Sequence, residues 1–270
     1  YAKIFTKKFT KFAHDYSLYK KMMKSIAIIP ARMGSSRFPG KPMALISGKP
    51  MIGHVHDNVK KCNLLEFVVV ATCDKIIFDY INKIGGIAVM TSKKHQRASD
   101  RCAEALNKVE TKFKKKFDIV VMVQGDEPMV TSKMIAESIK PFSKDKKIGV
   151  VNLLSKFENY NEFLNPNTIK VVCDKNLNAV YFTRKLDNKY FFDKSLKCGK
   201  QVCIIPFKRE FLEIFLKLKS TPIEKLESID MLRFLEHGYK VRMKKISSLS
   251  FAVDNKEDLK KVSNYINKKK

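Results

Sequence analysis

The sequence contains little arginine, no CxxC pair and no long apolar run. Arginine accounts for eight of the 54 basic residues. No apolar run approaches the ~18 residues that a membrane span needs, so we expect no stable membrane insertion. None of the six cysteines stands in a cysteine or histidine cluster with the spacing of a zinc site. We therefore expect free thiols and a reducing, cytoplasmic location rather than a disulfide framework.

Acidic residues are also few, and the formal net charge is +27. A charge of this size is typical of proteins that bind nucleic acid or anionic membranes. Here, however, the lysines are scattered over the whole chain, as the codon bias of an AT-rich genome would leave them. We therefore expect no nucleic-acid partner. Under such a bias, each arginine is expected to mark a position that needs a planar, bidentate guanidinium.

The chain has 270 residues, 44% of them apolar, and can therefore bury a sizeable core. Residues 1–24 are lysine-rich, with aromatic residues at helical spacing. We expect them to be a basic extension outside the fold, and a basic amphipathic helix on a membrane surface is the alternative. Residues 25–270 show no linker and no internal repeat, so we expect them to form a single domain.

Short apolar runs alternate with amphipathic stretches from Ser25 onward. In the first half we expect strands at 25–30, 66–72, 86–90 and 117–123, and helices at 50–63, 75–83 and 98–109. In the second half, apolar runs at 149–154, 169–172 and 202–207 predict a mixed extension of the sheet, and helices are expected at 208–218, 223–236 and 255–267. This order predicts an α/β fold with a parallel sheet, right-handed crossovers and a C-terminal lobe.

The stretch PARMGSSRFPGKP directly follows the first expected strand. That position lies at the carboxyl edge of the sheet, where α/β proteins bind ligands. Its glycine and serines, Ser36 among them, let backbone N–H groups approach an anion closely. Arg32, Arg37 and Lys41 could then neutralise a triphosphate. The stretch is not a Walker A loop, because Lys41 is followed by Pro42, and a plain surface loop is the alternative.

Two further stretches carry acidic residues beside expected ligand sites. Asp126, in VQGDEP, ends the fourth expected strand on the same edge as the arginines. A carboxylate that faces a polyphosphate needs a cation between them, and Mg²⁺ suits that position. Asp254, in FAVDNKEDL, precedes the last helix and is a candidate second ligand. For both aspartates, a helix cap is the alternative.

The stretch TSKKHQRASDRCAEAL places Arg97 and Arg101 around Ser99 and Asp100, just before a helix. Ser99 or Asp100 could cap that helix while Arg101 turns into the cleft. A loop that recognises a base or a ribose is the functional interpretation. The residues alone favour neither interpretation over the other.

Together these stretches resemble the 3-deoxy-manno-octulosonate cytidylyltransferases, the CMP-Kdo synthetases, over roughly Ser25 to Val262. IIPARMGSSRFPGKP is similar to the family's PAR-x-x-S-x-R-x-PGKP signature, HQRASDR to HQSGTDR, and VQGDEP to the same element in the family. YFTR resembles YFSR, EKLESIDMLR resembles EKxESLEQLR, and VDNKEDL resembles VDTPEDL. Six such matches in the right order are a specific signal.

The resemblance implies a Rossmann-like nucleotide-diphospho-sugar transferase fold, with a mostly parallel mixed sheet, and it implies a homodimer. It also implies Mg²⁺-dependent transfer of CMP from CTP to a 3-deoxy sugar acid. The implied catalytic residues are Arg32, Lys41 and Asp126, and the implied metal ligands are Asp126 and Asp254. The implied nucleotide-binding residues are Arg32, Ser36, Arg37, Lys41, Ser99, Arg101 and Gln124.

The implied sugar-binding residues are Arg184, Gln201 and Asp230, and here the sequence departs from the family. Gln201 and Ile205, in KQVCIIPF, replace a histidine and a tyrosine of RHIGIYAY, and Asp230-Met231 replaces a Glu-Gln pair. The acceptor is therefore expected to be Kdo bound differently, an amino-Kdo or another 3-deoxy sugar acid. The alternatives are a sugar nucleotidyltransferase with a different acceptor and a non-catalytic protein that binds polyanions.

Overall fold

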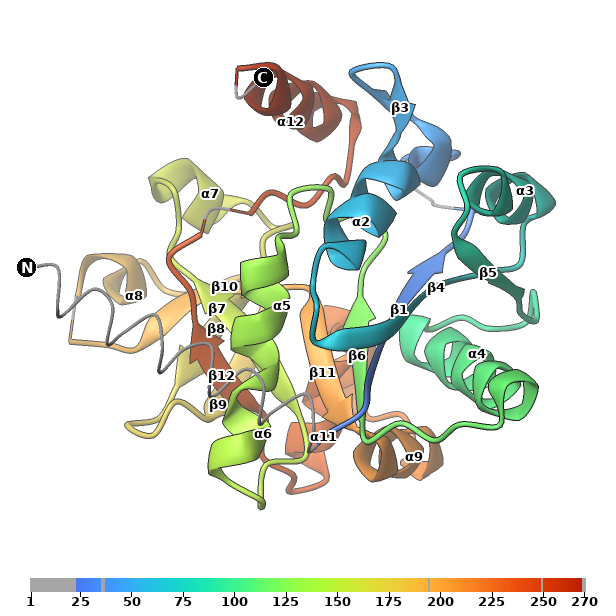
Figure 1. Ribbon diagram of the computed structural model, residues 1–270. Coiled ribbons are helices and arrows are strands. Elements are labelled where there is room, and N and C mark those ends of the chain that lie inside the picture. Colours follow the sequence, from blue (N-terminus) through green and yellow to red (C-terminus); the bar gives the residue numbers. More distant parts are fainter. Residues whose placement is uncertain (1–22, 35–36, 194, 249, 269–270) are drawn as a thin grey trace, which may run out of the picture.

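The computed structural model describes residues 23–34, 37–193, 195–248 and 250–268. Residues 1–22 of the expected extension, and Ser36, lie outside the described residues. The first half of the chain builds a five-stranded sheet in the order β11-β6-β1-β4-β5 (Figure 1). Its strands are β1 (Ser25–Ala31), β4 (Leu65–Thr72), β5 (Ile87–Met90), β6 (Ile119–Val123) and β11 (Ile204–Lys208). Strands β1, β4, β5 and β6, from the first half of the chain, run parallel, as the sequence predicts. Strand β11, from the second half, is antiparallel to β6.

Strand β1 is buried along its whole length, because helices cover both faces of the first sheet. Ile26 and Ile28 point to one core, which α4 and α9 close, whereas Ala27 and Ile29 point to the other, which α2, α3 and α5 close. A strand buried on both faces reads as a continuous apolar run rather than an alternating one. The helices on the two faces are α2 (Met51–Lys60), α3 (Lys75–Lys83), α4 (Ala98–Phe113), α5 (Ser132–Ile139), α6 (Pro141–Lys144) and α9 (Arg209–Lys217).

The second half does not simply extend the first sheet, which corrects the expectation from the sequence. Only β11 joins the first sheet, and the other strands form a second sheet in the order β12-β7-β10-β8-β9. The apolar run at 202–207 is split at Cys203, whose N–H donates to the buried carboxylate of Glu127. The second sheet contains β7 (Val151–Ser155), β8 (Lys170–Cys173), β9 (Ala179–Thr183), β10 (Cys198–Val202) and β12 (Arg242–Lys245).

The helix expected at 223–236 is also divided. Ser228 adopts a left-handed conformation with φ 55°, which ends α10 (Pro222–Glu227) before α11 (Met231–Glu236) begins. Arg233 holds the two pieces together, since its guanidinium donates to both carboxylate oxygens of Glu224 at 2.8 and 2.7 Å. The break turns the segment around Asp230 toward the space between the two sheets.

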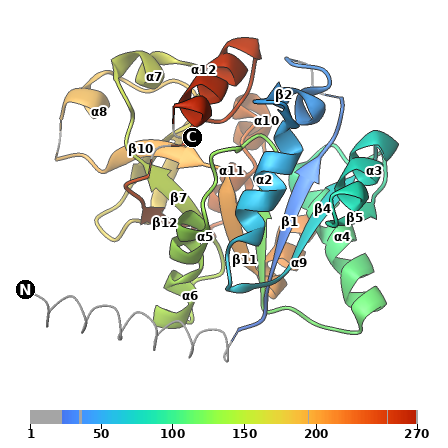
Figure 2. The same cartoon turned by 45° about the horizontal axis from the view of Figure 1, so that its top comes forward.

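The C-terminal helix α12 (Lys256–Asn267) lies beside the segment that follows the arginine stretch (Figure 2). That segment contains the short helix η1 (Lys41–Met43) and the hairpin strands β2 (Leu45–Ile46) and β3 (Lys49–Pro50). A small separate core joins them, with Phe38 and Met51 on one side and Phe251, Val253 and Val262 on the other. The remaining short helices, α7 (Tyr160–Leu164) and α8 (Lys189–Phe192), border the second sheet. Within the described ranges, no helix is both long and apolar enough to span a bilayer.

Candidate active site

A cleft of about 720 Å³ opens at the carboxyl ends of β1 and β6 and continues over the second sheet. Parallel strands direct the residues that follow them to one edge, so segments distant in sequence meet there. The cleft brings together nearly all of the residues that the sequence singled out. These are Arg32, Arg37, Lys41, Arg101, Gln124, Asp126, Arg184, Gln201, Asp230 and Asp254.

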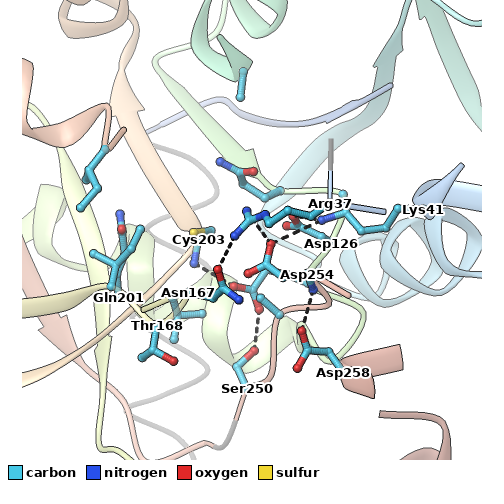
Figure 3. A pocket seen from close by; sticks show the side chains of 18 of the residues that line it. Arg37, Lys41, Asp126, Asn167, Thr168, Gln201, Cys203, Ser250, Asp254 and Asp258 are labelled. Carbon is cyan, nitrogen blue, oxygen red and sulfur yellow. Dashed lines mark hydrogen bonds and ion pairs between the residues drawn. The ribbon is translucent and has the colours of Figure 1, made fainter. Parts of the chain in front are cut away.

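Asp126 and Asp254 converge on a single positive charge (Figure 3). The Lys41 Nζ atom lies 2.7 Å from Asp126 Oδ2 and 3.8 Å from Asp254 Oδ1. Arg37 adds a second cation, with its Nη2 atom 2.8 Å from Asp254 Oδ1. Two carboxylates from distant parts of the chain thus face the same point in the cleft.

Neither aspartate is a helix cap, so the structure contradicts the alternative given for them from the sequence. Asn255 caps α12, because its side chain accepts from the N–H of Asp258, and Asp258 completes a capping box. Thr131 caps α5 in the same way, five residues after Asp126 along the chain. The carboxylate of Asp254 is therefore available to the cleft. Burial, together with the nearby charge of Asp126, raises the pKa of Asp254 above its usual value.

The two carboxylates fit a divalent cation that also binds a substrate. In the part of the chain that the structure describes, no group of three or more histidine, cysteine, aspartate or glutamate side chains is placed to hold a metal. Mg²⁺ commonly takes one or two protein carboxylates and completes its octahedral shell with phosphate oxygens and water. The Lys41 ammonium shows that a cation is electrostatically favourable between Asp126 and Asp254.

The arginine stretch is held in a defined shape over the cleft. Gly40 has φ 75°, a conformation that favours glycine, and its N–H donates to the carbonyl of Met33 at 2.9 Å. The N–H of Met33 in turn donates to Asp74 Oδ2 at 2.8 Å. Arg37 crosses to the other wall, where its Nη1 atom donates to Asn167 Oδ1 at 2.5 Å. Arg32 is exposed on the lining of the cleft. Arg32 and Arg37 therefore both lie on the lining of the cleft.

The first turn of α4 gives a mixed result. Arg101 is 3% exposed and donates to Thr91 Oγ1, while its Nη2 atom has no hydrogen-bond partner. A buried, unpartnered guanidinium nitrogen on a cleft wall is a donor available to a ligand. Ser99 is not placed for the nucleotide contact expected of it, because it is fully buried and absent from the lining. It also makes no cap, since α4 begins at Ala98 without a side-chain cap.

The part of the cleft over the second sheet contains the three residues assigned to the sugar. Arg184 Nε and Nη1 donate to the carbonyls of Glu227 and Pro166 at 2.8 and 3.1 Å, and the backbone N–H of Arg184 donates to the Glu227 carboxylate at 2.8 Å. Among the described residues, no carboxylate forms an ion pair with this guanidinium. Gln201 Oε1 is buried and has no hydrogen-bond partner. Asp230 is paired with Arg97, whose Nη1 atom lies 2.7 Å from its carboxylate. Burial raises the pKa of Asp230 despite this partner.

Buried lysines support this second region. Lys170 is 1% exposed, and its ammonium donates to the carbonyls of Asn165 and Arg184 at 2.7 and 2.8 Å. Burial, reinforced by the charge of Arg184, lowers the pKa of Lys170 to about 8. Lys200 binds Glu162 and the carbonyl of Ser250. The contacts of Lys200 join residues 38 and 50 positions apart, so no local spacing pattern indicates them.

Other lining residues were missed by the sequence analysis as well. Arg97 and Asn167 contact predicted site residues across the cleft. Glu127 stands next to Asp126 but is 2% exposed, and burial raises the pKa of its carboxyl to about 7. From the sequence, Glu127 is expected at the carboxyl edge of the sheet together with Asp126, because both follow a buried strand. Only a role for its side chain was missed.

Comparisons with known proteins identify the family of the chain. A family model described as cytidylyltransferase matches residues 26–246. The chain is 39% identical over 251 residues to a 3-deoxy-manno-octulosonate cytidylyltransferase of Geobacter metallireducens, covering 89% of this chain and 96% of that protein. It is 40% identical over 242 residues to one of Syntrophus aciditrophicus, covering 89% and 96%.

Solved structures extend the comparison. The chain is similar, with a TM-score of 0.81 and 30% identity, to a CMP:2-keto-3-deoxy-manno-octonic acid synthetase complexed with CTP, over 92% of this chain and 100% of that one. A 4-diphosphocytidyl-2C-methyl-D-erythritol synthase of Anaerococcus prevotii aligns with a TM-score of 0.62 at 15% identity, over 93% and 99% of the two chains. At that identity the second likeness concerns the fold alone.

Proposed function

The chain belongs to the 3-deoxy-manno-octulosonate cytidylyltransferase family, and from this membership we propose that it transfers CMP from CTP to Kdo or a Kdo-like 3-deoxy sugar acid. A hydroxyl oxygen of the sugar acid attacks the α-phosphorus of CTP. The bond to the bridging oxygen of the β-phosphate breaks, pyrophosphate leaves and the hydroxyl proton is released. The convergence of Asp126 and Asp254 on one cation is the observation that carries this proposal.

The chain's own residues divide the work of binding and orientation. Arg32, Arg37 and Lys41 hold the phosphates and the departing pyrophosphate by charge-assisted hydrogen bonds. Asp126 and Asp254 would hold Mg²⁺, which neutralises charge on the phosphate oxygens when it is bound. Ligand binding then exchanges partners, since Lys41 and Arg37 leave the carboxylates for the phosphates. We assign Gln124 and Arg101 to nucleotide binding, and Ser36 remains an expectation from the sequence. Catalysis of this kind depends on positioning and electrostatic stabilisation.

The acceptor is proposed to bind over the second sheet. The Arg184 guanidinium has no ion-pair partner among the described residues and can pair with the carboxylate of a sugar acid. Gln201 offers a buried, unpartnered oxygen to a sugar hydroxyl. The pairing of Asp230 with Arg97 supports a variant acceptor or a variant binding mode.

We place the enzyme in the cytoplasm, because CTP is available there and all six cysteines are free. We also propose a homodimer, as the resemblance implies. Support comes from large apolar side chains that are exposed on elements bordering the second sheet, namely Leu164, Val180 and Phe192. Analytical ultracentrifugation at micromolar concentration tests this proposal, and a monomer there would contradict it.

The decisive assay measures pyrophosphate release from CTP with a panel of 3-deoxy sugar acids, including Kdo and an amino-substituted Kdo. We expect release that needs both an acceptor and a divalent cation, and that stops with chelator. Release with another sugar class alone would favour a nucleotidyltransferase with a different acceptor. No release with any acceptor, together with salt-sensitive binding to nucleic acid, would favour a non-catalytic polyanion-binding protein.

A further inference from the structure

Glu127 joins three segments of the chain from a buried position. One carboxylate oxygen, Oε1, accepts from the N–H of Cys203 at 3.0 Å, at the point where β10 passes into β11. The other, Oε2, accepts from the hydroxyl of Ser250 at 2.7 Å. Both oxygens of this 2% exposed side chain are thus engaged by the protein. The side chain links the end of β6 to both the second sheet and the C-terminal segment.

The C-terminal segment is the one that carries Asp254, and its other ties lie close to this bond. The N–H of Val253 donates to the carbonyl of Asp126 at 2.9 Å. The carbonyl of Ser250 accepts from the buried ammonium of Lys200 at 2.9 Å. Ser250 is therefore fixed from two sides, and the chain from there to Asp254 is short.

We propose that Glu127 is a positioning residue, which sets the separation of the Asp126 and Asp254 carboxylates by holding Ser250, and does not itself bind the metal. This inference rests on the proposed function, because it concerns the cation that CTP brings. Residues that hold metal ligands in place typically change metal affinity by about 10- to 100-fold when they are removed.

The alternative is that Glu127 is a third, direct ligand, since it also lies on the lining of the cleft. The two roles demand opposite properties of the side chain. A positioning bridge needs its length and its two hydrogen bonds, whereas a ligand needs its negative charge. Glutamine keeps the length and aspartate keeps the charge, so Glu127→Gln and Glu127→Asp separate the two roles.

The experiment measures binding of Mn²⁺ in the presence of CTP, with free Mn²⁺ followed by electron paramagnetic resonance. We expect Glu127→Gln to bind within about twofold of the unmodified protein, because its carbonyl accepts from Cys203 while its amide donates to the Ser250 hydroxyl. Glu127→Asp should weaken Mn²⁺ by about tenfold. The thermal midpoint of each variant shows that the comparison is made between folded proteins.

Ser250→Ala provides the matched control on the other side of the bond. We expect it to weaken Mn²⁺ in the same direction as Glu127→Asp, and the double variant to be no worse than the weaker-binding single variant. Shared loss of this kind is the signature of two residues acting through one contact.

The inference is overturned if Glu127→Gln binds as poorly as Glu127→Asp or worse, or if all variants bind Mn²⁺ like the unmodified protein. An unmodified protein that binds no Mn²⁺ with CTP, and releases no pyrophosphate, would instead contradict the proposed function. The two failures are therefore distinguishable in one series of measurements.

Discussion

The two regions of the cleft prepare for their ligands in opposite ways. At the metal end, on the first sheet, Asp126, Asp254, Lys41 and Arg37 are already paired with one another. At the proposed acceptor end, over the second sheet, the Arg184 guanidinium donates to backbone carbonyls, and Gln201 Oε1 has no hydrogen-bond partner among the described residues. In the proposed mechanism, the first region exchanges internal ion pairs for ligand contacts, whereas the second offers a guanidinium without an ion-pair partner and a buried oxygen without a hydrogen-bond partner.

This difference predicts which interactions contribute most to the binding of each ligand. A divalent cation and a triphosphate bring both signs of charge, so they can replace Lys41 on the aspartates and then accept Lys41 in turn. A sugar acid brings one carboxylate, which can pair with the Arg184 guanidinium, and hydroxyls, one of which can donate to Gln201 Oε1. Leaving such a buried polar atom without a partner costs free energy. The metal end should therefore respond most strongly to loss of charge, and the acceptor end to loss of geometry.

The largest expected effect breaks the metal end. Asp126→Asn and Asp254→Asn should each reduce turnover by about 100- to 1,000-fold, because a lost carboxylate removes charge stabilisation from the transferring phosphoryl group. Since neither aspartate caps a helix, the free energy of unfolding should change by less than about 1 kcal/mol. Steady-state kinetics and chemical denaturation measure the two quantities. Unfolding at much lower denaturant with normal turnover would return Asp254 to a structural role.

The next effect concerns the pH dependence of stability that the buried Lys170, beside the proposed acceptor site, should cause. The buried Lys170 has its pKa lowered from 10.5 to about 8 by burial and by Arg184. Between these values the unfolded chain binds the proton more tightly than the folded one, so the free energy of unfolding rises with pH. Across that window, the unmodified protein should gain about 3 kcal/mol relative to Lys170→Met. Denaturant melts of both proteins from pH 7.5 upward test this, and parallel pH profiles would refute it.

A conservative change tests the geometry of the acceptor end. Arg184→Lys keeps the charge but loses the planar, bidentate guanidinium. We expect the KM for the sugar acid to rise about tenfold, because the variant loses one charge-assisted hydrogen bond to the carboxylate. Binding of CTP should stay nearly unchanged. If CTP affinity alone falls and the sugar kinetics do not, the sugar site lies elsewhere.

The smallest effect is expected at a residue beside the proposed metal ligand Asp254, and it separates stability from turnover. Asn255 is the neighbour of Asp254, but its side chain caps α12. Asn255→Ala should lower the free energy of unfolding by about 1 kcal/mol and leave turnover within about twofold. This variant and Asp254→Asn form a matched pair, one acting on stability and the other on chemistry. Loss of turnover in both would mean that α12 itself positions the metal ligand.

The first sheet could be predicted from the sequence because its buried strands are continuous apolar runs. Runs buried on both faces, as in β1, stand out against amphipathic helices such as α3, whose expected and observed bounds agree at 75–83. The second sheet gives a weaker signal. Strand β9 was missed because Val180 and Tyr181, in its middle, are exposed. The breaks at Cys203 and Ser228 depend on tertiary contacts and backbone conformation that no local pattern records.

The same distinction holds for the candidate site. Arg37, Lys41 and Asp126 were found because each follows a buried strand of the first sheet, and topology alone places them at one edge. Arg97 and Asp230 could not be recognised as a pair, since they lie 133 positions apart and no spacing pattern connects them. Ser99 was misplaced because its role came from the resemblance, whereas the first turn of α4 directs its side chain inward.

The bond between Glu127 and Ser250 spans 123 positions of the chain, which has a consequence for biosynthesis. At about 5–20 residues per second, a ribosome needs roughly 6–25 s to extend the chain by that length. During this time the nascent chain already contains β1, the arginine stretch and Asp126, but only one of the two proposed metal ligands. Translation that aborts before Ser250 therefore releases a product that cannot consume CTP, whatever part of it has folded.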